Sequence, residues 1–320
     1  TQDYDERTRL TSFRMFFNII GGLVAYTLPM LVIRSMLPEN LQRVFLMALI
    51  FGTLAALPYL LVFFGVREKK EYIEQKQPGV RDSLKAVRRN KPFFFAAMIY
   101  LFTWIVIILL ETNFMFYVKY VVKRPTQSSL VMGVFFIAAI AALPLWNWLS
   151  KKGNKRTTYI IGVTFWALAM LSLILVTPAT PLWTLLILCV LAGIGLSAAQ
   201  VLPWAIIPDA IEWDEYQTGE RHEGVFYSLI TLLGKVANSV AVPLSLLLLQ
   251  FTGYVSNAAE QPKSALLGLK LVIGPIPAVL LLIGIIFASF YPLSREKYAH
   301  VVSELAKRRE EKRRLKEAGN

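Results

Sequence analysis

The sequence predicts an all-α membrane protein, from its composition, the length of its apolar runs and the distribution of its charges. Of the 320 residues, 56% are hydrophobic, and the mean hydropathy is +0.52. Soluble domains contain roughly 45–50% apolar residues, so this chain is too apolar to be one. The apolar residues occur in long runs between short polar breaks, which is typical of helices that cross a bilayer.

A helix needs about 20 apolar residues to cross a bilayer. We predict eight spans, at 13–33, 44–66, 93–118, 128–149, 157–177, 182–207, 224–250 and 266–291. The longest connection, 67–92, alternates basic and apolar residues in its second half, which predicts a short amphipathic helix on the inner membrane surface. It divides the chain into a two-span piece at 1–66, this central cytoplasmic loop, a six-span piece at 93–292 and a basic cytoplasmic tail at 293–320.

Lysine and arginine are unevenly divided between the two sides. The side that holds both chain ends has 25 of them, and the opposite connections have six. Positively charged connections stay in the cytoplasm, so we expect a multi-pass plasma-membrane protein with both ends of this chain inside. The net charge is +13, but because the charge is unevenly spread it does not indicate nucleic-acid binding. The chain begins with Thr1 and no signal peptide precedes the first span, so we expect an N-terminal portion to be missing.

The most informative stretch is 208–238, in which a charged loop is followed by an apolar span that contains a lysine. Lys235 lies well inside this span, where insertion of a lysine costs ~2.5–3.5 kcal/mol. Tyr227, Thr231 and Asn238 share its helical face, so the four polar groups point to one cavity. The pattern favours a transport path, and a structural pair with a glutamate is the alternative.

Other spans also carry polar residues on one face. The further candidates for solute binding are Arg14, Asn18, Trp104, Glu111, Gln200 and Trp204. Arg14 could instead extend to the inner interface, and Glu111 could be a structural partner of an intramembrane cation. The sixth span contains two glycines and two prolines, which indicates either a helix that moves or close packing alone.

The acidic residues after the sixth span predict a cytoplasmic gate. Asp209, Glu212 and Glu215 follow one another at intervals of one turn, and Arg221 comes next. We expect them to pair with Arg7, Arg9 or Arg221 when the inner side is closed. A solvated loop is the alternative.

No pattern indicates an enzyme or a bound cofactor. Cys189 is the only cysteine and there are two histidines, so neither a disulfide framework nor a zinc site is expected. No nucleophile–base pair or phosphate loop stands out. We therefore expect a non-enzymatic, monomeric protein that binds a small solute and a coupling cation, Na⁺ or H⁺, within the lipid bilayer.

The run DAIEWDEYQTGERHEGVFYS, with GK at 234–235, resembles the signature of the glycoside–pentoside–hexuronide:cation symporter family. DERTRL at 5–10 and SLKAVRRNKPF also resemble this family, which belongs to the major facilitator superfamily. LPWAIIPDA and FTGY are similar to the related animal sodium-dependent lysophosphatidylcholine transporters. The resemblance implies a major-facilitator-type bundle of twelve spans, of which this chain would hold eight.

The resemblance also implies a function and roles for particular residues. Lys235 and Arg14 would border the sugar and cation sites, with Thr231 and Gln200 beside them. The acidic positions and Arg221 would form inner-gate ion pairs. The family's main acidic cation ligands and its sugar-binding aspartate would lie on spans outside this chain. Gln200 departs from the aromatic residue found at that position in a sugar-transporting member. We expect cation-coupled symport of a sugar or glycoside by alternating access. The alternatives are a lysophospholipid or other amphiphile as the solute, and a membrane scaffold without transport.

Overall fold

The computed structural model describes residues 13–14, 16–25, 28–29, 41–65, 85, 87–220, 222–256 and 258–318. All regular structure in these residues is helical. The long helices are α2 (Leu41–Gly65), α5 (Lys91–Phe116), α6 (Ser128–Lys152), α7 (Lys155–Ser172), α8 (Leu182–Thr218), α9 (Glu223–Phe251), α10 (Lys263–Ile273), α11 (Pro275–Ser289) and α12 (Arg295–Ala318). Short segments of other helix types are a π-helix at Tyr117–Val121 and 3-10 helices at Pro125–Gln127 and Leu173–Leu175.

The predicted spans are largely confirmed. Within the described residues, seven helical segments are long and apolar enough to cross a membrane. They correspond to the second through eighth predicted spans. The first, 13–33, is described only in part and contains a shorter apolar helix, Phe16–Ala25. Most of the 67–92 loop, with its predicted amphipathic helix, lies outside the described residues.

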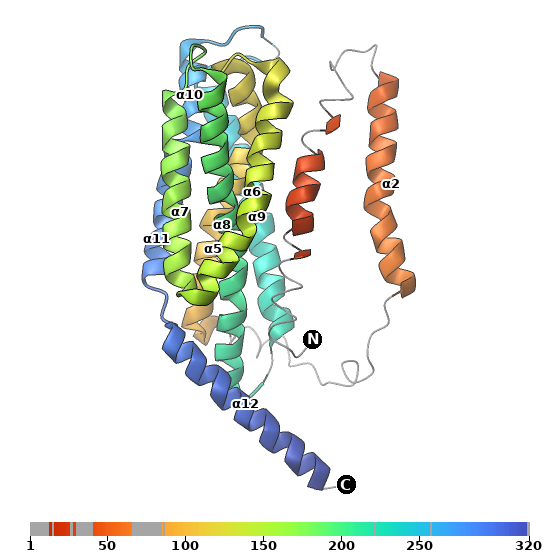
Figure 1. Ribbon diagram of the computed structural model, residues 1–320, viewed down its shortest axis with the longest axis vertical. Helices are drawn as coiled ribbons and strands as arrows, with labels where there is room; N and C mark the ends of the chain where they lie inside the picture. The colour runs from red at the N-terminus through yellow and green to blue at the C-terminus, as the bar shows by residue number, and fades with distance from the viewer. Residues whose placement is uncertain are drawn as a thin grey trace.

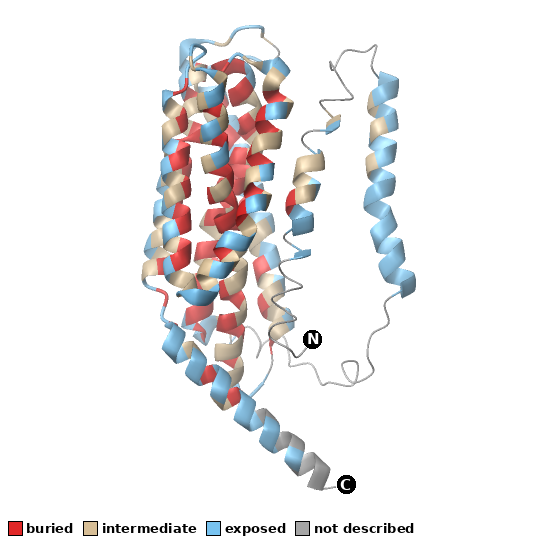
Figure 2. Cartoon of the chain, in the orientation of Figure 1, coloured by how far each residue is buried: buried red, intermediate tan, exposed pale blue. Residues whose placement is uncertain are grey.

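A helical bundle forms around α8 and α5 (Figure 1). α8 packs against α6, α7 and α5, while α5 packs also against α9 and α11. The inward faces of these helices are buried and their outward faces are exposed (Figure 2). Trp166 and Tyr159 on α7 and Phe226 on α9 are among the largest side chains that are fully buried. Exposed apolar side chains on the outer faces are what a bilayer requires of a spanning bundle.

The two-span piece lies beside this bundle. The Phe16–Ala25 helix contacts it through Ile19, which is only 1% exposed, and through Gly22, which lies against the Phe136 ring of α6. α2 stands apart and has no buried residue (Figure 2).

The predicted charged loop at 208–223 is corrected by the structure. α8 continues as a helix through Pro208 to Thr218, and the chain turns only at Gly219. Gly219 adopts φ 75°, the left-handed region in which glycine is favoured, and its N–H donates to the Glu215 carbonyl at 2.9 Å. The acidic residues therefore occupy fixed positions on a helical surface.

The last predicted span, 266–291, consists of two helices. Gly274 separates α10 from α11 with φ −110° and ψ −83°. The break follows from the residue after it, because Pro275 disfavours helical geometry at the preceding position and has no N–H to donate.

The C-terminal tail folds as α12 and crosses the end of the bundle (Figure 1). Val301 and Leu305 are buried and belong to the face of α12 that packs on α8. We call this end of the molecule, with α12 and the 150–156 turn, the α12 end.

Candidate functional site

A cavity of about 610 Å³ lies between the N-terminal segment and helices α5, α8 and α9. Its volume falls in the range of about 300–1,000 Å³ that is usual for small-molecule sites. It is lined by Arg14, Asn18, Tyr100, Trp104, Trp204, Thr231, Gly234, Lys235, Asn238 and Ser239.

One wall of the cavity is aromatic. The rings of Tyr100 and Trp104, one turn apart on α5, are stacked with centroids 5.2 Å apart and planes at 16°. Trp204 of α8 meets Tyr100 edge-on at 5.5 Å and 83°. The Arg14 guanidinium lies over the Trp204 ring, 4.7 Å from its centroid, which is a cation–π contact. The wall thus offers ring faces next to a fixed cation.

Most of the polar lining is built by α9. Thr231, Lys235, Asn238 and Ser239 are exposed on the cavity side of this helix, while Ala237 and Ala241 are buried behind them. The Lys235 ammonium makes no ion pair with any residue that the structure describes. The residues that line the described cavity include two cations and no carboxylate. The cavity therefore suits a solute that offers acceptors or a negative charge.

Seven of the ten predicted solute-binding residues border the cavity, namely Arg14, Asn18, Trp104, Trp204, Thr231, Lys235 and Asn238. Gln200, Glu111 and Tyr227 do not. Gln200 is 3% exposed within the bundle, and its Oε1 has no hydrogen-bond partner among the described residues. Glu111 lies two turns beyond Trp104 on α5 and forms no ion pair with Lys235.

Three lining residues were not among the predicted ones: Tyr100, Gly234 and Ser239. Tyr100 falls four residues before Trp104, which is the helical spacing that could have indicated it. Gly234 has no side chain, so nothing in the sequence could have identified it as a lining residue.

A polar cluster at the α12 end joins α7, α8 and α12. Lys155 Nζ lies 2.7 Å from Asp209 Oδ1 and donates to the Ala205 carbonyl at 2.9 Å. The Tyr298 hydroxyl donates to Glu212 Oε2 at 2.7 Å. The partners expected from the sequence, Arg7, Arg9 and Arg221, lie outside the described residues, and Glu215 is half-buried nearby. Asp209 therefore contacts a group of the six-span piece, and Glu212 contacts a group of the C-terminal tail.

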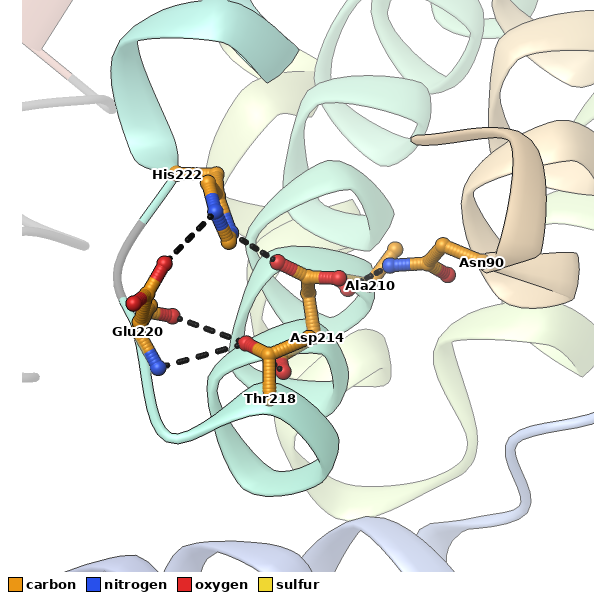
Figure 3. Close-up of polar contacts among 6 residues, drawn as sticks. All are labelled: Asn90, Ala210, Asp214, Thr218, Glu220 and His222. Carbon is orange, nitrogen blue, oxygen red and sulfur yellow. Dashed lines mark hydrogen bonds and ion pairs between the residues drawn. The ribbon is translucent and has the colours of Figure 1, made fainter. Parts of the chain in front are cut away.

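A second buried cluster joins the end of α8 to the start of α9 (Figure 3). Asp214 Oδ2 lies 2.7 Å from His222 Nδ1, and both residues are 4% exposed. Glu220 Oε2 lies 3.4 Å from the other ring nitrogen of His222. Asn90 anchors the start of α5 to the same region, because its Nδ2 donates to the Ala210 carbonyl at 2.7 Å.

A multi-span helical bundle with a polar, partly aromatic cavity between its helices is an architecture that membrane transport proteins use. Comparison with known sequences agrees: the profile of the family described as MFS/sugar transport protein matches residues 1–295. The chain belongs to this family of the major facilitator superfamily and is a multi-pass membrane protein. The family resemblance seen in the sequence and the predicted fold class are confirmed.

The relatives include symporters of two kinds. Sodium-dependent lysophosphatidylcholine symporter 1-A of Danio rerio is 31% identical over 74% of this chain and 45% of its own length. The glucuronide carrier protein homolog of Escherichia coli is 26% identical over 98% of this chain and 69% of its own length. An uncharacterized symporter of Synechocystis is 26% identical over 97% of this chain and 72% of its length. The chain thus spans about half the length of the lysophosphatidylcholine symporters that it matches.

Proposed function

We propose that this chain forms the larger part of a secondary active symporter in the plasma membrane and contributes part of its solute site. A monovalent cation, Na⁺ or H⁺, moves down its gradient and carries a glycoside-like solute with it. Cation and solute would each favour the same inward- or outward-facing state, and this shared preference couples their movements. The asymmetry of Lys and Arg supports an arrangement with both ends of this chain in the cytoplasm.

The observation that carries the proposal is the position of Lys235. A lysine in a spanning helix is retained where it meets water or a polar partner. Lys235 borders a cavity, with no ion-pair partner among the described residues. Its ammonium is thus available to a solute oxygen.

The remaining lining groups suggest the kind of solute. Asn18, Asn238, Thr231 and Ser239 offer amides and hydroxyls that match the hydroxyls of a sugar. Trp104 and Trp204 offer ring faces against which a sugar ring packs. Arg14 and Lys235 favour a solute that also carries an acidic group, such as a uronic acid.

A lysophospholipid is the second candidate, favoured by the 31% identity with a symporter of that class. The phosphate of its head group fits the two cations, and its acyl chain fits the aromatic wall. Competition assays distinguish the two solutes. If excess unlabelled glycoside inhibits uptake of the labelled glycoside but not uptake of lysophosphatidylcholine, a glycoside is the favoured solute.

The remaining alternative, a membrane scaffold without transport, predicts that Glu111 and Lys235 form a buried ion pair. Both residues are described, and no ion pair joins them. The structure therefore favours transport over this alternative.

The test is uptake of radiolabelled phenyl β-D-glucuronide and of labelled lysophosphatidylcholine into proteoliposomes that contain the full-length parent protein of this chain, under an imposed Na⁺ or proton gradient. Lys235→Ala should lower kcat/KM about 10–100-fold, because a hydrogen bond to a charged group contributes about 1.5–3 kcal/mol. Lys270→Met is the matched control: Lys270 also lies in a spanning segment, but its ammonium donates to the Ile174 carbonyl at 2.8 Å. Wild-type uptake by Lys235→Ala would remove Lys235 from the mechanism.

A further inference from the structure

We propose that the Tyr100 hydroxyl is a solute-binding group and that Gly234 provides the space in which it lies. This assignment rests on the proposed transport function. It adds a contact from α5 to those that the polar face of α9 can make.

The first observation is a tyrosine hydroxyl that opens to the cavity and has no partner among the described residues. Tyr100 is only 3% exposed, yet it borders the cavity. Its hydroxyl makes no hydrogen bond to any residue in the described part of the chain. The hydroxyl is not among the polar atoms that are sealed off without a partner, so its hydrogen bonds can be made only in the cavity. A bound solute would supply that partner.

The second observation is that the hydroxyl is held in place. Stacking on Trp104 at 5.2 Å and the edge contact with Trp204 at 5.5 Å fix the plane and the direction of the ring. The oxygen position is therefore set before a solute arrives, and binding need not order the side chain. Such preorganisation favours affinity and discrimination between solutes.

The third observation is the clearance at Gly234. A Cβ added there would lie 2.9 Å from Tyr100 Oη, a distance at which something must shift, and 3.8 Å from Trp104 Nε1. Any residue larger than glycine thus displaces the hydroxyl. Gly234 directly precedes Lys235, so the phenol and the ammonium border the same space and can bind neighbouring oxygens of one solute.

The experiment compares three variants in proteoliposomes: Tyr100→Phe, Gly234→Ala and the double variant. Phenyl β-D-glucuronide and lysophosphatidylcholine serve as probes. Tyr100→Phe keeps the ring stack and removes one neutral hydrogen bond, so KM for the transported probe should rise about 3–10-fold while kcat changes little. Gly234→Ala should raise KM in the same way. It should add nothing in the Tyr100→Phe background, because both changes act on one hydroxyl.

Tyr291→Phe is the matched control. Tyr291 is also buried, and its hydroxyl also has no partner among the described residues, but it does not line the cavity. An unchanged KM in Tyr100→Phe, or an equal rise in Tyr291→Phe, overturns the assignment and leaves the proposed function standing. Absence of saturable wild-type uptake of either probe overturns the proposed function and the assignment together. Additive effects of Tyr100→Phe and Gly234→Ala overturn the role given to Gly234.

Discussion

Lys155 bridges the Asp209 carboxylate and the Ala205 carbonyl of α8, at 2.7 and 2.9 Å. These two groups lie on either side of Pro208, at which the helix lacks a backbone N–H. A lysine at the start of α7 thus supports α8 beside its proline. The same Asp209 side chain is only 8% exposed, so its charge depends on this partner.

Lys155→Met should lower stability strongly, because it leaves the Asp209 carboxylate buried without its cation. Breaking a buried pair costs about 3–5 kcal/mol, whereas replacing both partners costs much less. The double variant Lys155→Met/Asp209→Asn should therefore unfold at a higher temperature than Lys155→Met alone. Thermal unfolding in detergent, followed by tryptophan fluorescence, measures both. A double variant that is less stable than the single one would contradict this account.

The Lys123–Glu260 pair is the natural comparison, since its N–O distance is 2.9 Å but its side chains are 54% and 81% exposed. Solvent screens an ion pair this exposed, so Lys123→Ala should leave the unfolding temperature almost unchanged. Lys123 holds the pKa of Glu260 below its usual range. The small contribution of the pair is therefore present above the pKa of the unfolded chain. It should be lost as pH falls through the lowered pKa, and high salt should also remove it.

The stability of the turn between α8 and α9 should depend on His222. His222→Ala removes the group that lies 2.7 Å from the buried Asp214 carboxylate, and an unsatisfied buried polar group costs about 1–3 kcal/mol. The exposed His300 of α12 is the control, for which a change to alanine should alter stability by less than about 0.5 kcal/mol. Hydrogen exchange measured by mass spectrometry should show faster exchange near 214–225 only in His222→Ala. Equal exchange in both variants would show that the pair does not hold the turn.

Arg14 should act through its fixed position as well as its charge. Its guanidinium lies 4.7 Å from the Trp204 ring centroid, and the planar group stacks in a way that an ammonium does not. Arg14→Lys should therefore weaken solute binding although the charge is kept, and Trp204→Leu should weaken it comparably. The measurement is KM for uptake of the transported probe. Full affinity in Arg14→Lys would mean that charge alone is required at this position.

Much of the fold could be predicted from the sequence, because a long apolar run in a membrane has few stable structures other than a spanning helix. The errors fall where tertiary contacts override local pattern. Residues 209–218 are charged and follow a proline, which suggested a loop, but Lys155, Asn90 and Tyr298 bind that stretch and keep it helical. Gly274 and Pro275 were visible inside the last span, yet apolar residues on both sides concealed the break.

The candidate site could be predicted along α9 but less well across helices. The polar face of α9 follows from spacing within one helix, and three of its four predicted residues border the cavity. Gln200 was expected there because it shares a helix with Trp204, but it is buried inside the bundle. Which side of α8 meets the cavity depends on how α6 and α7 pack against it, and the spacing within α8 does not contain that information. The same reasoning explains why Lys155 was not expected to be the partner of Asp209, 54 residues away.

The glycines of α8 were interpreted from the sequence either as a sign of a helix that moves or as a means of close packing. A last prediction distinguishes these two interpretations. A Cβ at Gly193 would lie 2.2 Å from the Phe135 carbonyl oxygen, and one at Gly195 would lie 2.4 Å from Trp166 Cβ. Both contacts are at or next to neighbouring backbone and cannot yield easily, so the glycines serve close packing of α8 against α6 and α7. Gly193→Ala and Gly195→Ala should each lower stability by at least about 1–3 kcal/mol, the usual cost of overpacking. Gly133→Ala on α6, where nothing lies within 4 Å of the added Cβ, should be neutral or slightly stabilising. If Gly193→Ala and Gly195→Ala instead keep wild-type stability and only slow uptake, the glycines would serve movement of α8, and its packing would not depend on them.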